Sequence, residues 1–408
     1  MCSAGIKREI PAMEPALSLI GRSEPLFETD LQRHAAELRE AIHGASFLVV
    51  GGGGSIGQAV CKEICRRNPR KLHVADISEN NLVELVRDIR STFSHLDGEF
   101  RTFVVDAGSP IFDCLVEHEG PYDYVLNLSA MKHVRSERDP YTLMRMIEVN
   151  IFNTDTGIRH AIHQKARKYF AVSTDKATNP VNMMGASKRI MEYFLILHSD
   201  KIPVSTARFA NVAFSDGSLL HGFHMRIQKR QPISAPSDIR RYFITKRESG
   251  ELCLISCLLG NNREILFPKL DDRMHLISFE KIAKQFLEQQ GYLAYPCESE
   301  HEARASVETL ARKGYWPCYF SPTTTSGEKL FEEFYTIKDE VDWKRFDTIG
   351  VIRLSSSKNR AKLEQFLQEV KELKRKGRWD KQMLLALFSE LIPEFTHRET
   401  GSNLDEKM

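Results

Sequence analysis

The chain has 408 residues, of which 57 are Lys or Arg and 55 are Asp or Glu, so its formal net charge is +2. This near-neutral balance argues against a dedicated nucleic-acid-binding domain, which is normally strongly basic, and no run approaches the ~20 apolar residues that span a bilayer. Hydrophobic residues make up 42% of the chain, which is ordinary for a globular protein with a sizeable core.

The amino-terminal residues and the cysteines indicate the cellular compartment. Charges interrupt residues 1–17, where a secretory signal would need an apolar run. The eight cysteines have neither zinc-finger spacing nor a nearby His cluster, and we expect them to be reduced thiols: Cys2, Cys61, Cys65, Cys114, Cys253, Cys257, Cys297 and Cys318. The sequence therefore predicts a cytoplasmic protein without a metal site.

The first half of the chain alternates between two kinds of segment. Residues 1–44 are expected to form an N-terminal helical extension, with helical spacing over 30–43. Short apolar runs then occupy 47–51, 71–76, 100–106, 122–129, 168–174 and 204–211, separated by amphipathic stretches near 56–67, 79–93, 141–164 and 183–199. This order indicates βαβ units with strands buried on both faces. We predict an α/β fold, a Rossmann-type doubly wound parallel sheet with a smaller mixed α/β C-terminal substrate domain.

Beyond residue 212 this alternation ends and the charge becomes uneven. Residues 225–247 carry seven Lys or Arg against one Asp, and residues 351–381 carry ten Lys or Arg against four Asp or Glu. Helical spacing recurs near 300–313, 358–376 and 380–391. We expect a first domain over 45–212, a second region over 213–350 that is partly interleaved with it, and a C-terminal helical extension over 351–408.

A glycine-rich loop follows the first predicted strand. Gly51, Gly54 and Gly57 precede a predicted helix, so the backbone can turn tightly and approach a diphosphate at the helix N-terminus. Asp76 ends the second strand, where a carboxylate binds the adenosine ribose, and no Arg follows it to receive a 2′-phosphate, which favours NAD over NADP. The expected NAD-binding residues are Gly51, Gly54, Ser55, Ile56, Gly57, Asp76, Asp106, Ala107, Ser129 and Lys188.

Several motifs together resemble one enzyme family. They read VGGGGSIG (50–57), NLSAMKHV (127–134), STDKATNPVNMMGASKR (173–189), RFANV (208–212), RRYF (240–243) and SGEKLFEE (326–333). Over roughly residues 45–335 the chain resembles the extended short-chain dehydrogenase/reductases. Within them it is most similar to the nucleotide-sugar 4,6-dehydratases of bacterial polysaccharide biosynthesis, which act on UDP-N-acetylglucosamine.

The resemblance implies a catalytic set of Thr174, Asp175, Lys176, Met184 and Lys188. NAD would take a hydride from C4 of the sugar and return it to C6 after water is lost. Lys176 is the expected base at C5 and Asp175 the expected acid at C6, with the pKa of the Lys lowered and that of the Asp raised. Thr174 would orient the C4 hydroxyl and Lys188 would hold the nicotinamide ribose.

Met184 stands where many relatives have a Tyr that exchanges a proton. A thioether cannot do so, which excludes the plain Tyr–Lys mechanism at this position. One branch of the dehydratases also has Met here. A side chain that only fills the core remains an alternative for this residue.

The resemblance also implies a UDP-sugar site. The expected substrate-binding residues are Lys132, His133, Asn211, Ser218, Arg241 and Glu328. Arg donors suit a diphosphate, and the basic residues of 225–247 agree with that ligand. A homo-oligomer is expected by analogy. Two alternatives stay open: an epimerase or dehydrogenase on the same scaffold, and a catalytically silent NAD-binding protein.

Overall fold

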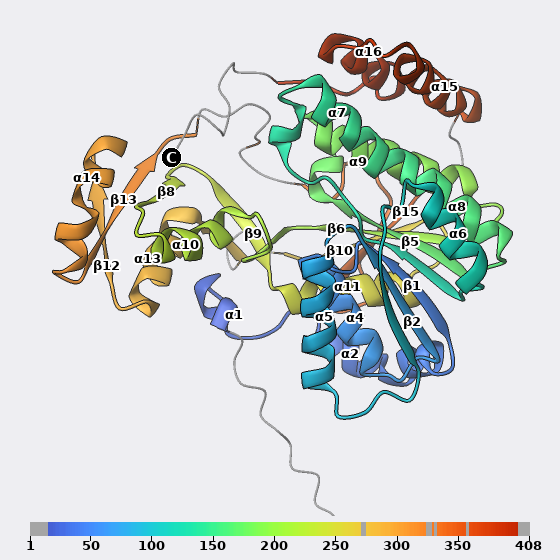
Figure 1. Ribbon diagram of the computed structural model, residues 1–408, viewed down its shortest axis with the longest axis horizontal. Coiled ribbons are helices and arrows are strands. Elements are labelled where there is room, and N and C mark those ends of the chain that lie inside the picture. The colour runs from blue at the N-terminus through green and yellow to red at the C-terminus, as the bar shows by residue number, and fades with distance from the viewer. Residues whose placement is uncertain (1–14, 271–274, 324–328, 330–332, 356–358, 399–408) are drawn as a thin grey trace, which may run out of the picture.

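The computed structural model describes residues 15–270, 275–323, 329, 333–355 and 359–398. Its centre is a nine-stranded sheet with the order β14-β15-β10-β6-β5-β4-β1-β2-β3 (Figure 1). The parallel strands are β1 (Ser46–Val50), β2 (Lys71–Asp76), β3 (Glu99–Val104), β4 (Tyr124–Asn127), β5 (Lys168–Thr174), β6 (Val204–Phe209) and β10 (Glu264–Pro268). At one edge β15 (Ile349–Arg353) pairs antiparallel with β10, and β14 (Val341–Asp342) pairs antiparallel with β15.

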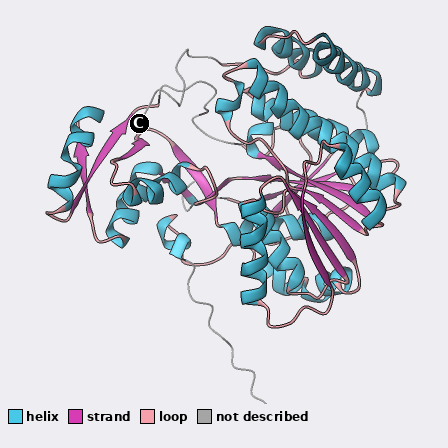
Figure 2. Ribbon diagram, viewed as in Figure 1, coloured by secondary structure: helices cyan, strands magenta, loops and turns pink. Residues whose placement is uncertain are grey.

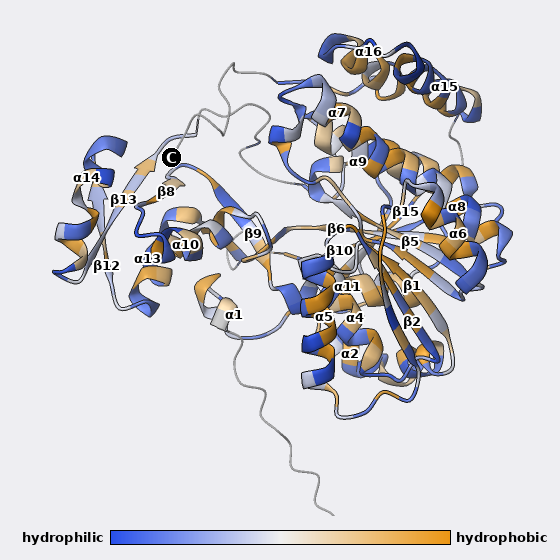
Figure 3. Ribbon diagram, viewed as in Figure 1, coloured by the Kyte–Doolittle hydropathy of each residue, from blue (hydrophilic) through white to orange (hydrophobic). Residues whose placement is uncertain are grey.

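Helices cover both faces of this main sheet because alternate strand residues are apolar on both sides. Phe47 and Val49 of β1 belong to a core cluster with residues of α4 (Ser55–Cys65) and α11 (Lys246–Leu258). Leu48 and Val50 belong to a second cluster with residues of α6 (Pro110–Glu119), α8 (Asn153–His163) and α9 (Met183–His198). Figure 3 shows the hydrophobic character of these central strands. Helix α5 (Glu79–Thr92) lies beside α4, between β2 and β3 in the chain.

A smaller unit extends from the main sheet, at the left of Figure 2. Its parallel sheet has the order β12-β13-β8, with β8 (Ile233–Pro236), β12 (Leu293–Cys297) and β13 (Tyr315–Ser321). Helices α10 (Leu219–Gln228), α13 (Phe279–Gln289) and α14 (Glu300–Ala311) pack against these strands. A third small sheet, β11 (Leu276–Ser278), β9 (Arg240–Ile244) and β7 (Asn211–Val212), lies between this unit and the main sheet.

The two ends of the described chain pack onto this frame. At the N-terminal end, α1 (Pro15–Leu19) contacts α13 of the smaller unit. At the other end, α15 (Arg360–Lys376) and α16 (Lys381–Leu391) pack on α9, and they share an apolar cluster with α9 and α7 (Pro140–Ile147), at the top of Figure 1. None of the described helices is both long and apolar enough to cross a membrane.

The predicted fold class is confirmed, and all six predicted strands are present within a few residues of their expected bounds. Apart from β10, β15 and α6, which were not predicted, three details differ. The helix expected over 30–43 is two helices, α2 (Glu28–Arg33) and α3 (Ala35–Ile42), because the backbone leaves the helical conformation at His34. The stretch expected over 141–164 contains a five-residue π-helix (Glu148–Phe152) between α7 and α8. The boundary expected between residues 350 and 351 falls inside β15, because that strand pairs with β10 in the main sheet.

Candidate active site

The glycine-rich loop packs backbone against backbone. Gly51 has a φ of +78°, which favours glycine, and a Cβ added to it would lie 2.5 Å from the Ser129 nitrogen. A Cβ on Gly57 would lie 2.4 Å from the Gly51 carbonyl oxygen. Gly54 caps α4, and the Ile56 side chain packs against the core. The loop therefore brings backbone and a helix N-terminus together at the carboxyl end of β1, as a diphosphate site requires.

Asp76 lies beside this loop. Its carboxylate accepts hydrogen bonds from the backbone nitrogens of Gly53 and Ser78, both at 2.9 Å. A Cβ on Gly53 would lie 3.0 Å from that carboxylate. The side chain is thus held at the carboxyl end of β2, next to the start of α4.

Asp106 has a partner that the sequence analysis missed. One of its oxygens accepts a hydrogen bond from the Gly108 nitrogen, and the other forms an ion pair with Arg145 of α7. Ala107 lines a small apolar recess beneath α6 and α8. The Asp106 carboxylate, one of the expected NAD-binding residues, is therefore already paired with a cation.

Thr174, Asp175 and Lys176 lie together where β5 ends. The Thr174 hydroxyl donates to Asp175 Oδ1 at 2.8 Å, and the Lys176 backbone nitrogen donates to the same oxygen at 2.8 Å. Lys176 Nζ lies 3.3 Å from it, so one carboxylate oxygen contacts both other residues. The Asp175 side chain is 3% exposed and that of Lys176 is 21% exposed. Ligands of open α/β sheets bind at such strand ends.

The first turn of α9 packs directly on this group. Asn182 caps the helix by accepting a hydrogen bond from the Gly185 nitrogen at 2.7 Å. A Cβ added to Gly185 would lie 2.3 Å from the Lys176 carbonyl oxygen. Met184 is 3% exposed and lies in the apolar cluster shared by α7, α9 and the C-terminal helices. Its surroundings are those of a packing residue.

Lys188 follows one turn later on α9. Its Nζ donates to the Val172 carbonyl oxygen of β5 at 3.1 Å. Burial lowers the pKa of Lys188 to about 7, although the charge of Glu192 opposes the shift. This lysine can therefore change its protonation state near neutral pH, depending on what binds beside it.

Two buried polar groups near the site were missed. Asn150 in the π-helix donates to the Ser187 hydroxyl at 2.9 Å and exchanges two hydrogen bonds of 3.0 Å with the Met131 backbone. On the other side of α9, the Glu192 carboxylate accepts hydrogen bonds from the Ser173 hydroxyl at 2.7 Å and from Arg208 Nε at 2.9 Å. These contacts fix α9 relative to the ends of β4, β5 and β6.

Lys132 and Ser55 are connected through Asp216, two residues before Ser218. Lys132 Nζ donates to the Asp216 carbonyl oxygen at 2.7 Å, and the Asp216 nitrogen donates to the Ser55 hydroxyl at 2.9 Å. Ser218 caps α10. Beside Lys132, His133 Nε2 lies 3.0 Å from the Cβ position of Gly217. Burial lowers the pKa values of both Lys132 and His133.

The remaining predicted substrate residues lie on the small central sheet or outside the described residues. Asn211 of β7 donates to the Tyr242 carbonyl oxygen at 3.3 Å. Arg241 of β9 is buried and donates to the Lys329 carbonyl oxygen at 2.9 Å, while Lys329 Nζ donates to the Thr178 carbonyl oxygen at 2.6 Å. Two contacts thus connect Arg241 with the turn that carries Asp175 and Lys176. Glu328 lies outside the described residues.

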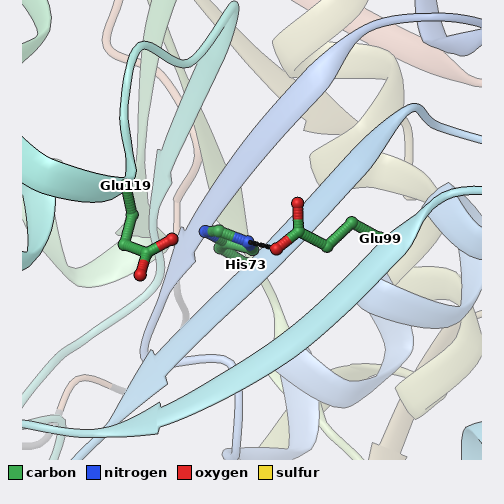
Figure 4. A group of neighbouring side chains, drawn as sticks. All are labelled: His73, Glu99 and Glu119. Carbon is green, nitrogen blue, oxygen red and sulfur yellow. Dashed lines mark hydrogen bonds and ion pairs between the residues drawn. The ribbon is translucent and has the colours of Figure 1, made fainter.

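Another polar group lies at the opposite end of the main sheet. His73 is buried between Glu99 and Glu119, and its Nε2 lies 3.1 Å from Glu99 (Figure 4). The possible ligand atoms of these residues lie within 4.8 Å of one another. Arg101, however, contacts Glu119 at 2.6 Å and Glu99 at 3.5 Å, and the Tyr122 hydroxyl lies 2.9 Å from His73 Nδ1. This set is an ion-pair network among residues of β2, β3 and the end of α6.

A family model described as polysaccharide biosynthesis protein matches residues 47–354. Over 303 residues the chain is 29% identical to an "uncharacterized membrane protein" of Methanocaldococcus jannaschii, covering 72% of this chain and 81% of that protein. It is 28% identical over 298 residues to the "probable polysaccharide biosynthesis protein EpsC" of Bacillus subtilis, covering 71% of this chain but only 46% of the relative. The match thus spans less than half of EpsC.

Two further relatives carry enzyme names. One is the "UDP-N-acetylglucosamine 4,6-dehydratase (inverting)" of Campylobacter jejuni, 27% identical over 237 residues, covering 56% of this chain and 68% of the relative. The other is a "UDP-glucose 4-epimerase" of Rickettsia bellii, 28% identical over 235 residues, covering 55% and 66%.

Two solved structures share the fold. Pen from Bacillus thuringiensis has a TM-score of 0.62 at 23% identity, covering 76% of this chain and 88% of the other. DesIV from Streptomyces venezuelae, a dTDP-glucose 4,6-dehydratase with NAD and TYD bound, has a TM-score of 0.53 at 15% identity, covering 71% and 88%.

Proposed function

Because the chain belongs to the polysaccharide biosynthesis protein family, as the sequence motifs indicated, we propose that it is an NAD-dependent nucleotide-sugar 4,6-dehydratase, a lyase. Its proposed substrate is a UDP-N-acetylhexosamine, with UDP-N-acetylglucosamine as the first choice, and its product a 4-keto-6-deoxy sugar nucleotide for a surface polysaccharide. The observation that carries the proposal is the contact of Thr174, Asp175 and Lys176 at the end of β5.

The residues around the glycine loop fit NAD. Gly51 and Gly57 leave no room for a Cβ, as a loop that approaches a diphosphate requires, and Asp76 supplies a carboxylate for ribose hydroxyls. The remaining residues proposed for this site are Gly54, Ser55, Ile56, Asp106, Ala107, Ser129 and Lys188. Bound NAD would supply a hydride acceptor for C4 and a hydride donor for C6 of the sugar.

The chain itself supplies the elimination step. A ketone at C4 acidifies the proton at C5, and Lys176 in its amine form removes that proton. Asp175 in its acid form donates a proton to the C6 hydroxyl, which leaves as water. Thr174 orients the C4 hydroxyl for the first step, and Lys188 orients the nicotinamide ribose.

The Asp175–Lys176 contact can provide these protonation states without an outside proton. Transfer of one proton across the 3.3 Å from Lys176 Nζ to Asp175 Oδ1 converts an ion pair into an amine and a carboxylic acid. A site from which water is excluded would favour the neutral form of this pair, because desolvation penalises the charged form of each partner. After the elimination, Lys176 has gained a proton and Asp175 has lost one, which restores the ion pair. Lys176 then returns its proton to C5 as the hydride reaches C6, and the proton that the C4 hydroxyl loses in the first step balances the one that Asp175 gave to the leaving water.

The proposed diphosphate site combines Asn211, Ser218 and Arg241, with Lys132 and His133 near the sugar. Two hydrogen bonds support this arrangement: Arg241 donates to the Lys329 carbonyl oxygen, and Lys329 Nζ donates to the carbonyl oxygen of Thr178, which follows the Asp175 turn. An Arg that is buried and planar is suited to a diphosphate between the cofactor and the small unit. Glu328 stays a prediction for the uridine ribose.

The test is mass spectrometry of the purified protein with a panel of UDP-sugars. Loss of one water from UDP-N-acetylglucosamine, with no net NADH, supports the dehydratase. Deuterium from D₂O should enter at C5, because the proton there is exchanged through Lys176. A product of unchanged mass without that deuterium would overturn the proposal.

An epimerase on the same scaffold is the second candidate, and the similarity to a UDP-glucose 4-epimerase favours it. It would return a sugar isomer of unchanged mass. Net NADH production would indicate a dehydrogenase, and NAD binding without turnover a silent binding protein. A homo-oligomer and a cytoplasmic location stay predictions.

A further inference from the structure

The C-terminal helices α15 and α16 pack on α9, and α9 in turn contacts the turn that carries Asp175 and Lys176, here named the catalytic turn. Three contacts fix them on the main domain: Trp379 Nε1 donates to the Pro140 carbonyl oxygen at 2.9 Å, Lys374 forms an ion pair with Glu148, and Arg360 Nη2 donates to the Leu197 carbonyl oxygen at 3.4 Å. The chain then leaves α16 as a short segment over residues 393–398, which we name the C-terminal tail. Its path is therefore determined by α7 and α9.

The tail packs on the loop that begins α9. Phe395 is 8% exposed and lies in the same apolar cluster as Met183 and Met184. The Arg398 nitrogen donates to the Val181 carbonyl oxygen at 3.0 Å. A backbone hydrogen bond thus holds the tail to Val181, and Phe395 adds it to the apolar cluster that contains Met183 and Met184.

Glu137 joins the tail to the first residue of α9. One of its carboxylate oxygens accepts a hydrogen bond from the Met183 nitrogen at 2.6 Å, and the other lies 3.4 Å from His397 Nε2. Glu137 and His397 are both nearly buried, with side chains that are 6% and 9% exposed. A buried carboxylate needs such partners. Here α9 supplies a hydrogen bond from the Met183 nitrogen, and the tail supplies the His397 imidazole within ion-pair distance, although its Nε2 forms no hydrogen bond with the described residues.

A displacement of Met183 would also displace Lys176. Asn182 and Gly185 form the cap of α9, and Gly185 presses against the Lys176 carbonyl with no room for a Cβ. Packed interiors transmit such shifts because they contain little free volume.

We propose that the C-terminal tail is a positioning element for the catalytic turn, with Glu137 and His397 as the positioning residues that connect them. This would give the C-terminal extension, for which the sequence suggested no partner, a role within the enzyme. The effect on turnover rests on the proposed function, whereas the effect on the start of α9 does not.

The test uses four variants of the full chain: Glu137→Ala, Glu137→Gln, His397→Ala and the control Glu390→Gln on the exposed side of α16. Amide hydrogen exchange is measured over residues 182–186, together with kcat, KM and NAD affinity. Glu137→Ala should make exchange there about tenfold faster and lower kcat about tenfold, with KM and NAD affinity within about threefold. Glu137→Gln keeps an acceptor for Met183 and should restore most of both losses. His397→Ala should lie between them, and the control should match the wild type.

Unchanged exchange over 182–186 in both Glu137→Ala and His397→Ala would overturn the proposal. So would an equal rise in exchange throughout the protein, because it indicates a general loss of stability. If Glu137→Ala does not fold, His397→Ala and Glu137→Gln decide by the same measurements. If the wild type does not dehydrate any UDP-sugar, the proposed function fails by itself, and the local exchange still decides the role of the tail.

Discussion

Gly185 and Lys176 are in contact through their backbones, and a Cβ on Gly185 would lie 2.3 Å from the Lys176 carbonyl oxygen. Real Cβ atoms essentially never come so close, so either α9 or the turn that carries Lys176 must shift when a side chain is added. The glycine in the first turn of α9 thus sets the distance between that helix and the proposed base.

Gly185→Ala should therefore lower kcat by at least about tenfold and cost about 1–3 kcal/mol of stability, as overpacking does. The matched control is Gly222→Ala in α10, where nothing lies within 4 Å of the added Cβ. Alanine is the better helix former, so the control should keep its activity and gain up to ~1 kcal/mol. Steady-state kinetics and chemical denaturation measure both variants. Equal behaviour of the two would contradict the contact as a determinant of activity.

Asp175→Asn should block the elimination and spare the oxidation at C4. An amide cannot donate the proton that the C6 hydroxyl needs, nor accept one from Lys176, which then stays an ammonium. We expect water loss to fall by about 10²–10⁴-fold, the usual contribution of general acid–base catalysis, while reduced cofactor accumulates on the enzyme. Absorbance of NADH in a single turnover, with mass spectrometry of the sugar, measures both. Normal water loss by this variant would remove Asp175 from the role of acid.

The strands of the main sheet were predictable where they are buried on both faces. The six apolar runs differ clearly from the amphipathic helices between them. Strands β10 and β15 were missed, because they come after the part of the chain in which strands and helices alternate regularly. They pair with each other in the sheet through residues as distant in the chain as Glu264 and Arg353. Such pairing is tertiary and has no local signal. Helix α6 was also missed, although it does have a local sequence signal: Ser109 is its N-cap and Pro110 is its first residue.

The residues of the candidate site likewise include some that the sequence could predict and some that it could not. Gly51, Asp76 and the Asp175–Lys176 pair were predictable because each stands at a strand end, and a parallel sheet brings those ends to one edge. Arg145 was not, since its ion pair with Asp106 depends on how α7 crosses the sheet. The tail contact with Glu137 joins residues 260 positions apart in the chain, and neither residue type indicates it.

Asp76→Ala should weaken NAD binding. In the structure this carboxylate accepts two backbone hydrogen bonds, and it is proposed to accept further ones from the ribose hydroxyls. A hydrogen bond to a charged group contributes about 1.5–3 kcal/mol. This corresponds to a loss of affinity of roughly 10–150-fold. Isothermal titration with NAD measures it, with the exposed Asp97→Ala as the control. Unchanged affinity would show that the ribose lies elsewhere.

Lys188 should make stability depend on pH. Burial lowers its pKa from 10.5 to about 7. Below pH 7 both the folded and the unfolded chain hold the proton, so the folded state carries a buried ammonium. Between about pH 7 and 10.5 the unfolded state holds the proton and the folded state does not, so this lysine raises the free energy of unfolding as the pH rises. Lys188→Met lacks that dependence.

Denaturation without NAD at pH 6 and pH 9 tests this. The stability of Lys188→Met relative to the wild type should be higher at pH 6 than at pH 9, and the exposed Lys201→Met should show no such difference. The same relative stability at both pH values would mean that the lysine keeps its ordinary pKa when folded.

Arg208→Met should be among the most destabilising substitutions in the chain. Arg208 and Glu192 are fully buried, with two hydrogen bonds of 2.9 and 2.8 Å between them, and Arg208 also donates to the Phe334 carbonyl oxygen at 2.6 Å. Burial alone would raise the pKa of Glu192, but Arg208 and Arg189 hold it at about 2, so the carboxylate stays charged. Removing one partner of a buried pair costs roughly 3–5 kcal/mol, because the other charge is left uncompensated.

Urea denaturation of two matched variants tests this. Arg230→Met breaks an exposed pair with Glu308 and should leave the midpoint nearly unchanged. The double variant Arg208→Met/Glu192→Met should recover part of the loss, because it removes the buried charge as well as its partner. A double variant less stable than Arg208→Met alone would show that the lost contacts with Ser173 and Arg189, rather than an unpaired carboxylate, account for the destabilisation.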